Sequence, residues 1–128
     1  MSDKTDSEDL MDIFYEETQG LIEEMRKELS TLGGEKIKSV FFRLFRCVHN
    51  IKSSSGAVGF DNLRDMAHAL EKIFKVEKEK KSKINADVIA LFSESIEACQ
   101  RLLNEEEVVG YKELLERLNK YYLFLRSE

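Results

Sequence analysis

The sequence predicts an all-α fold, an up-down antiparallel four-helix bundle with an additional C-terminal helix. Three observations support this. None of the 128 residues is proline and only six are glycine, so no helix interior is forced to break. Apolar residues recur at helical spacing in five segments, and no segment shows a sustained two-residue alternation. The length suits a single domain, 1–128, with a bundle core at about 8–104.

Two amphipathic helices are predicted in the first half of the chain. The first follows Ser7, which we expect to be its N-cap, and ends at Gly33-Gly34, which provide the C-cap. The second runs from about Glu35 to about Ser55, and a tight turn at Gly56–Gly59 follows it. The short connection makes the two helices antiparallel neighbours. Their apolar stripes are Leu10, Phe14, Leu21, Met25, Leu29 and Leu32, then Ile37, Val40, Phe41, Leu44, Val48 and Ile51.

Three further helices are predicted in the second half. One starts near Asp61, its expected N-cap, and fades into the charged stretch Lys75–Lys83. Asn85 caps the next helix, and Glu105–Gly110 is a loop. A flanking fifth helix occupies about 110–126. The stripes are Leu63, Ala67, Leu70 and Phe74, then Val88, Leu91, Phe92, Ser95, Cys99 and Leu102, then Tyr111, Leu114, Leu115, Leu118, Tyr121, Tyr122 and Leu125.

Charge and composition exclude several classes of function. The net charge of −5 lacks the basic footprint of a nucleic-acid-binding domain, and the basic run Lys78–Lys83 includes a glutamate. The polar, acidic N-terminus and the lack of a long apolar stretch argue against a signal peptide or membrane anchor. Cys47 and Cys99 form no CxxC pair, so we expect both to be buried small residues in a reduced, cytoplasmic protein.

His49 is the first candidate for chemistry. It lies one residue past Val48 of the core stripe, about 100° around the helix, so it is expected on a partly exposed flank. Lys52 is three residues further and shares that side, where an ammonium group would offset the charge of an incoming phosphoryl group. Taken singly, a surface histidine and a solvated lysine are the commoner interpretations of such residues.

Two residues of the predicted third helix are expected to face His49. Counting back from the Gly56–Gly59 turn places His68 level with His49, and Glu71 within about one helical turn, ~5 Å. A carboxylate that accepts from one imidazole nitrogen fixes the tautomer and makes the other nitrogen a better nucleophile. Each residue has a plainer alternative, because Glu71 could be a solvent-facing glutamate and His68 an ordinary surface histidine.

Taken together, these residues match a family pattern. The stretch resembles the histidine phosphotransfer domain at the N-terminus of chemotaxis-type histidine kinases, over roughly residues 8–104. That pattern has a phospho-accepting histidine, a hydrophobic residue, a lysine, a run of small residues, a Gly-Phe turn, and then Leu, His and Glu on the next helix. Here these are His49, Ile51, Lys52, Ser53–Gly56, Gly59-Phe60, Leu63, His68 and Glu71, with Phe14, Glu17 and Leu21 matching the family's first helix.

The resemblance implies that an ATP-bound kinase domain phosphorylates His49 at Nε2 and that an aspartate of a response regulator receives the phosphoryl group. Glu71 would orient and activate the imidazole, Lys52 would offset phosphoryl charge, and His68 would join the polar network. The sequence has no G-x-x-x-x-G-K-[ST] motif, so ATP and Mg²⁺ are expected on the partner kinase rather than on this chain. As an isolated domain the chain is expected to be a monomer.

The sequence departs from the family pattern at three positions. Ser53 and Ser54 stand where the family often has glycine, and Val58 stands where it often has an aromatic residue.

Two other classes of function are alternatives to phosphotransfer. The main rival is a scaffold or adaptor bundle that binds a partner helix without being phosphorylated. A metal-binding bundle is disfavoured, because neither histidine has a glutamate three residues before it. The match also favours a piece of a longer kinase, a transferase, over a complete small protein.

Overall fold

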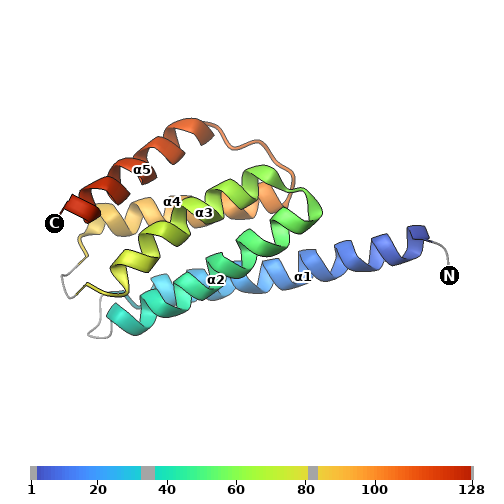
Figure 1. Ribbon diagram of the computed structural model, residues 1–128, viewed down its shortest axis with the longest axis horizontal. Helices are drawn as coiled ribbons and strands as arrows, with labels where there is room; N and C mark the ends of the chain where they lie inside the picture. Colours follow the sequence, from blue (N-terminus) through green and yellow to red (C-terminus); the bar gives the residue numbers. More distant parts are fainter. Residues whose placement is uncertain (1–2, 33–36, 81–83, 128) are drawn as a thin grey trace.

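The computed structural model describes residues 3–32, 37–80 and 84–127, which form five helices and no strand in those ranges. Helices α1 to α4 pack as an up-down antiparallel bundle in which α1 contacts α2 and α4, and α3 contacts α2 and α4 (Figure 1). Helix α5 lies outside this ring, mainly against α3. The predicted fold class is therefore confirmed. The bounds are α1 Asp3–Leu29, α2 Ile37–Val58, α3 Asp61–Glu77, α4 Ala86–Leu103 and α5 Tyr111–Ser127.

The core fills the space between the four helices. Phe41, Phe74 and Phe92 come from three different helices and meet at its centre, with ring centroids 5.1–6.0 Å apart. Most predicted stripe residues in the described ranges are buried or half-buried. Leu10 was predicted as a core residue and is instead 64% exposed. The reason is that the N-terminal end of α1 extends past the other helices, so nothing covers that turn (Figure 1).

Two predicted N-caps and one predicted helix end are wrong, whereas the predicted start of α3 near Asp61 is confirmed. Helix α1 begins at Asp3, so Ser7 lies inside the helix and is not its N-cap, while Gly33-Gly34 lies outside the described residues. Helix α3 begins with Asp61 itself, and its N-cap is Phe60, which makes no side-chain capping bond. It also remains helical to Glu77 rather than fading from Lys75. The cap predicted at Asn85 is confirmed, because its side chain accepts from the Val88 N–H at 2.9 Å.

The turn between α2 and α3 is shorter than predicted. Helix α2 continues through Gly56 to Val58, which leaves Gly59, with φ of +84°, to make the reversal. Inside this last part of α2 the hydroxyls of Ser54 and Ser55 donate to the carbonyls of Asn50 and Ile51, four residues earlier, so both hydroxyls are satisfied within the helix. A left-handed φ favours glycine, so Gly59 is the residue that sets the close antiparallel pairing of α2 and α3.

Helix α5 is fixed to α3 by polar contacts as well as by buried leucines. The Tyr111 hydroxyl donates to the Asn62 carbonyl and the Tyr121 hydroxyl donates to Glu77 Oε2, at 2.8 and 2.7 Å. Lys80 Nζ, just past α3, donates to the Leu125 carbonyl at 2.8 Å. The predicted fifth helix is thus a packed part of the structure. In the described ranges, no helix is both long and apolar enough to cross a bilayer.

Candidate functional site

Four polar side chains meet on the seam between α2 and α3, with the Glu71 carboxylate at their centre. Glu71 Oε2 lies 2.6 Å from His49 Nδ1, and Oε1 lies 2.6 Å from Lys52 Nζ. His68 Nδ1 lies 3.7 Å from Oε1, within range of an ion pair but beyond a hydrogen bond. The carboxylate therefore bridges His49 and Lys52, and His68 stands at the edge of the cluster.

Burial differs sharply across the cluster. The His49 side chain is 53% exposed, whereas the Glu71 side chain is only 12% exposed. A macromolecule can therefore reach the imidazole while the carboxylate behind it is shielded from water. Shielding strengthens the contact between them, because a hydrogen bond to a charged group weakens when water competes for it.

The charge state of Glu71 decides which nitrogen of His49 bears hydrogen. Burial raises the pKa of the Glu71 carboxyl, but hydrogen bonds from Lys52 and His49 outweigh burial and hold the pKa below its usual value. Glu71 is therefore ionised near neutral pH and can only accept hydrogen bonds. Nδ1 of His49 must donate to it, and in a neutral ring that leaves the lone pair on Nε2, the other ring nitrogen.

The surface around His49 is shaped by small and aromatic neighbours. Ser53 follows His49 by one helical turn and is exposed, so only a small side chain flanks the imidazole there. On the other side, the Phe45 ring stacks beside the imidazole, with centroids 6.0 Å apart and planes 21° apart. Lys78 Nζ lies 4.5 Å from the Phe45 centroid. Sequence reasoning missed Lys78, although it lies two turns beyond Glu71 on the same face of α3.

Other polar and nucleophilic groups lie away from this seam. Burial raises the pKa of both Cys47 and Cys99 to about 12, so neither thiol is a ready nucleophile, and both are buried as predicted. Among the described residues, no group of three or more His, Cys, Asp or Glu side chains could hold a metal ion.

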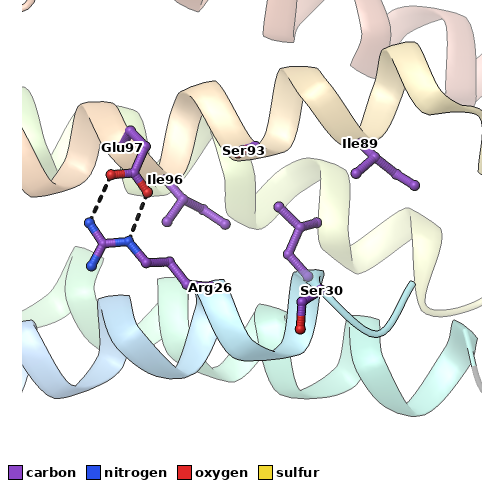
Figure 2. A pocket seen from close by; sticks show the side chains of 7 residues that line it. Arg26, Ser30, Ile89, Ser93, Ile96 and Glu97 are labelled. Carbon is purple, nitrogen blue, oxygen red and sulfur yellow. Dashed lines mark hydrogen bonds and ion pairs between the residues drawn. The ribbon is translucent and has the colours of Figure 1, made fainter. Parts of the chain in front are cut away.

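A groove of about 250 Å³ lies on the opposite side of the bundle, between α1 and α4 (Figure 2). Apolar side chains of Leu29, Ile89 and Ile96 line it. The ion pair between Arg26 and Glu97 spans it, with two N–O distances of 2.8 Å. The lining of this groove includes two serines but no histidine or cysteine that could activate a hydroxyl or act itself, so the α2–α3 seam remains the candidate site.

Comparison with known families identifies the family to which this helical bundle belongs. The family described as Hpt domain matches residues 9–120, which is most of the chain and includes more than half of α5. The chain belongs to the Hpt domain family. The resemblance to histidine phosphotransfer domains inferred from the seam residues is thereby confirmed, and the matched region reaches further than the roughly 8–104 inferred from the motif.

Several relatives of this Hpt domain are chemotaxis proteins. Chemotaxis protein CheA of Borreliella burgdorferi is 27% identical over 99 residues, which is 77% of this chain and 12% of that protein. The CheA proteins of Salmonella typhimurium and Rhizobium meliloti are each 28% identical over 100 residues, again 77% of this chain, and 15% and 13% of those proteins. The chain thus matches only a small part of each relative. Family membership supports a role as a phosphotransfer carrier in two-component signalling.

Proposed function

We propose that Nε2 of His49 accepts a phosphoryl group from the ATP-bound catalytic domain of a histidine kinase and passes it to an aspartate of a response regulator. One observation supports this above the others. The imidazole is half exposed while its Nδ1 lies 2.6 Å from a shielded carboxylate. An imidazole held in this way presents a lone pair on Nε2 to an incoming molecule.

The proposed transfer balances without a further reactant. The Nε2 lone pair forms the N–P bond while the bond from phosphorus to the bridging oxygen of ATP breaks, and ADP leaves with that electron pair. Nε2 has no proton to lose, because the ring proton is on Nδ1. The ring gains positive charge as the N–P bond forms, and the Glu71 carboxylate stabilises that charge through the Nδ1–H contact.

Lys52 and His68 have supporting roles in this proposal. Lys52 donates to Glu71 Oε1, which holds the carboxylate ionised and in position, and we propose that its ammonium group also offsets the charge of an incoming phosphoryl group. His68 Nδ1 lies 3.7 Å from the same oxygen, so His68 joins the polar network through Glu71 and does not contact phosphorus. Glu71, Lys52 and His68 therefore tune the nucleophile, and only His49 forms a bond.

ATP and Mg²⁺ are proposed to belong to the partner kinase domain. The sequence has neither a Gly-rich phosphate loop nor a Walker A motif, and the seam residues are one carboxylate, one ammonium and two imidazoles. Such a set suits an acceptor of a phosphoryl group rather than a nucleotide site. We propose that the exchange takes place in the cytoplasm, where ATP is available and the two free cysteines remain reduced.

The experiment that tests this function compares the two histidines of the chain. Wild type, His49→Gln and His68→Gln would be incubated with a chemotaxis-type kinase catalytic core, Mg²⁺ and labelled ATP. We expect acid-labile, alkali-stable label on wild type and His68→Gln and none on His49→Gln. Label retained by His49→Gln would contradict the assignment. Unlabelled wild type with several kinase cores would favour the scaffold alternative, in which the exposed Phe42 contacts a partner helix.

A further inference from the structure

The seam continues beyond Glu71 as a second row of contacts. Phe45 lies one turn before His49 on α2, and Lys78 lies two turns after Glu71, at the C-cap of α3. Because α2 and α3 run antiparallel, these two positions meet on the same side of His49. Lys78 Nζ lies 4.5 Å from the Phe45 centroid and 5.9 Å from that of the exposed Phe42.

A single hydrogen bond does not fix an imidazole completely. The contact between His49 Nδ1 and Glu71 locates one ring nitrogen, but the ring can still pivot about the line that joins those two atoms. The Phe45 ring stands beside the imidazole at 6.0 Å, with the two planes only 21° apart. A near-parallel neighbour at this distance restricts that pivot, because aromatic pairs have preferred relative orientations. Phe45 and Glu71 thus hold the ring from two directions.

Phe45 itself needs support, because it is only half-buried. Lys78 supplies it from the neighbouring helix, with its ammonium over the face of the Phe45 ring, the arrangement of a cation–π contact. The backbone of Lys78 is fixed as well, since its N–H donates to the Phe74 carbonyl at 3.0 Å. The order of contacts is therefore Lys78 to Phe45 to His49.

We propose that Phe45 and Lys78 are positioning residues for phosphoryl transfer: Lys78 holds the Phe45 ring, and the Phe45 ring holds the His49 imidazole in the orientation that presents Nε2. The inference rests on the proposed role of His49. Neither residue contacts phosphorus, and Lys78 acts only through Phe45. In-line transfer depends steeply on the orientation of the nucleophile, so a loosened ring reacts more slowly even when its hydrogen bond to Glu71 survives.

The test uses a small phosphoryl donor, phosphoramidate, whose reaction with His49 does not depend on a protein partner binding to the surface around it. Phosphoramidate transfers its phosphoryl group to an imidazole as its P–N bond breaks and ammonia leaves with the electron pair. We expect Phe45→Leu to slow acid-labile labelling of the full chain about three- to tenfold and Lys78→Met about two- to fivefold, the range that such ring contacts allow. The double variant should be no slower than Phe45→Leu alone, because Lys78 acts through Phe45.

Matched variants separate positioning from loss of structure. Phe45→Tyr and Lys78→Arg keep the ring and the cation, so both should label at close to the wild-type rate. Arg126→Met is the control for loss of a cation–π contact away from the site, because Arg126 lies 5.8 Å from the Tyr122 ring centroid on α5. This variant should label at the wild-type rate. A second readout needs no phosphate: ring-current shifts of the His49 ring protons should change in Phe45→Leu and Lys78→Met and persist in Arg126→Met.

The outcomes are distinct. Variants that label normally with phosphoramidate but slowly with a kinase core would show that Phe45 and Lys78 contact the partner, and this would overturn the positioning role. Additive losses in the double variant would overturn the chain of contacts from Lys78 through Phe45. Wild type that takes no label on His49 from either donor would overturn the proposed function and this inference together, whereas labelled wild type with unaffected variants would overturn this inference alone.

Discussion

Two glutamates of α3 have opposite surroundings. Glu71 is near the surface and contacts Lys52 and His49 of α2. Glu77 is 2% exposed and accepts a hydrogen bond from the Tyr121 hydroxyl of α5 at 2.7 Å. They are six positions apart along α3, so their side chains point about 120° apart around the helix. The same residue type on one helix therefore contacts the candidate site on one face and attaches α5 on another.

The difference lies in what each carboxylate supports. Glu71 stands behind a half-exposed imidazole, so its charge acts on a group that another molecule can reach. Glu77 is enclosed by the protein, so its contact with Tyr121 stabilises the fold without affecting a reactive atom. Removing Glu71 should therefore change reactivity more than stability, and removing Glu77 should do the reverse.

The largest effect is expected from Glu71→Ala. Loss of the carboxylate leaves the His49 ring without its Nδ1 partner, and we expect phosphoryl acceptance to fall about 10- to 100-fold without vanishing, as for other carboxylates that orient a histidine. The rate of labelling from a kinase core measures it. The matched control is Glu77→Gln, which removes one negative charge from the same helix and should leave that rate unchanged. Equal rates for Glu71→Ala and wild type, with the helical content intact, would place Glu71 outside the site.

The second prediction concerns Glu77→Ala. This change removes the buried hydrogen bond that Glu77 accepts from the Tyr121 hydroxyl and should lower the free energy of unfolding by about 1–3 kcal/mol, measured by urea denaturation. Folded protein should still accept phosphoryl groups at the wild-type rate. Tyr121→Phe and the double variant complete a thermodynamic cycle, in which the two losses should not add. An additive cycle would mean that the two side chains stabilise the fold independently.

The third prediction is a pH dependence of stability. The folded-state pKa of Glu71 lies below its usual value, so its contribution to stability is present above the unfolded pKa of about 4.3 and disappears as pH falls through the folded pKa. Wild type should therefore exceed Glu71→Gln in unfolding free energy at pH 7, and the difference should shrink toward zero in strong acid. A difference that does not vary with pH would mean that the ionised form of Glu71 gains nothing on folding.

The smallest effect is expected from Ser53→Gly. Ser53 is exposed one turn from His49, and glycine is the residue that the family often has at this position. Acceptance should stay at the wild-type rate, while the helix loses roughly 0.5 kcal/mol of stability from the lower helix propensity of glycine. Labelling rate and urea denaturation measure the two quantities. A collapse in rate would give the serine an active role and would contradict the proposal that Glu71 and Phe45 are the residues that orient the imidazole.

Sequence predicted part of this contrast and missed the rest for physical reasons. Helical periodicity predicted all five helices, because each buries one apolar face. Counting residues back from the turn placed Glu71 within a turn of His49, and the 2.6 Å contact is consistent with that placement. The contact between Glu77 and Tyr121 was not predicted, because it depends on how α5 docks against α3, which no local pattern specifies. Lys78 was not predicted as part of the surface around His49, because it lies in a run of charged residues and such runs are usually solvated.

Lys52 illustrates an intermediate case. Its spacing from His49 correctly predicted that the two share a face, since residues three apart on a helix are neighbours. Spacing could not reveal that the ammonium group bonds to Glu71 Oε1, so that the carboxylate joins the two side chains. Pairwise spacing within one helix predicts proximity, whereas the partner that organises a cluster comes from a second helix and needs the tertiary structure.

The most direct test of the central claim locates the phosphoryl group on a single atom. Protein labelled with ¹⁵N-histidine would be phosphorylated and examined by NMR for coupling between ³¹P and the ring nitrogens. We expect coupling to Nε2 of His49, with Nδ1 still protonated and hydrogen-bonded to Glu71. Coupling to Nδ1 of His49, or to either nitrogen of His68, would contradict it.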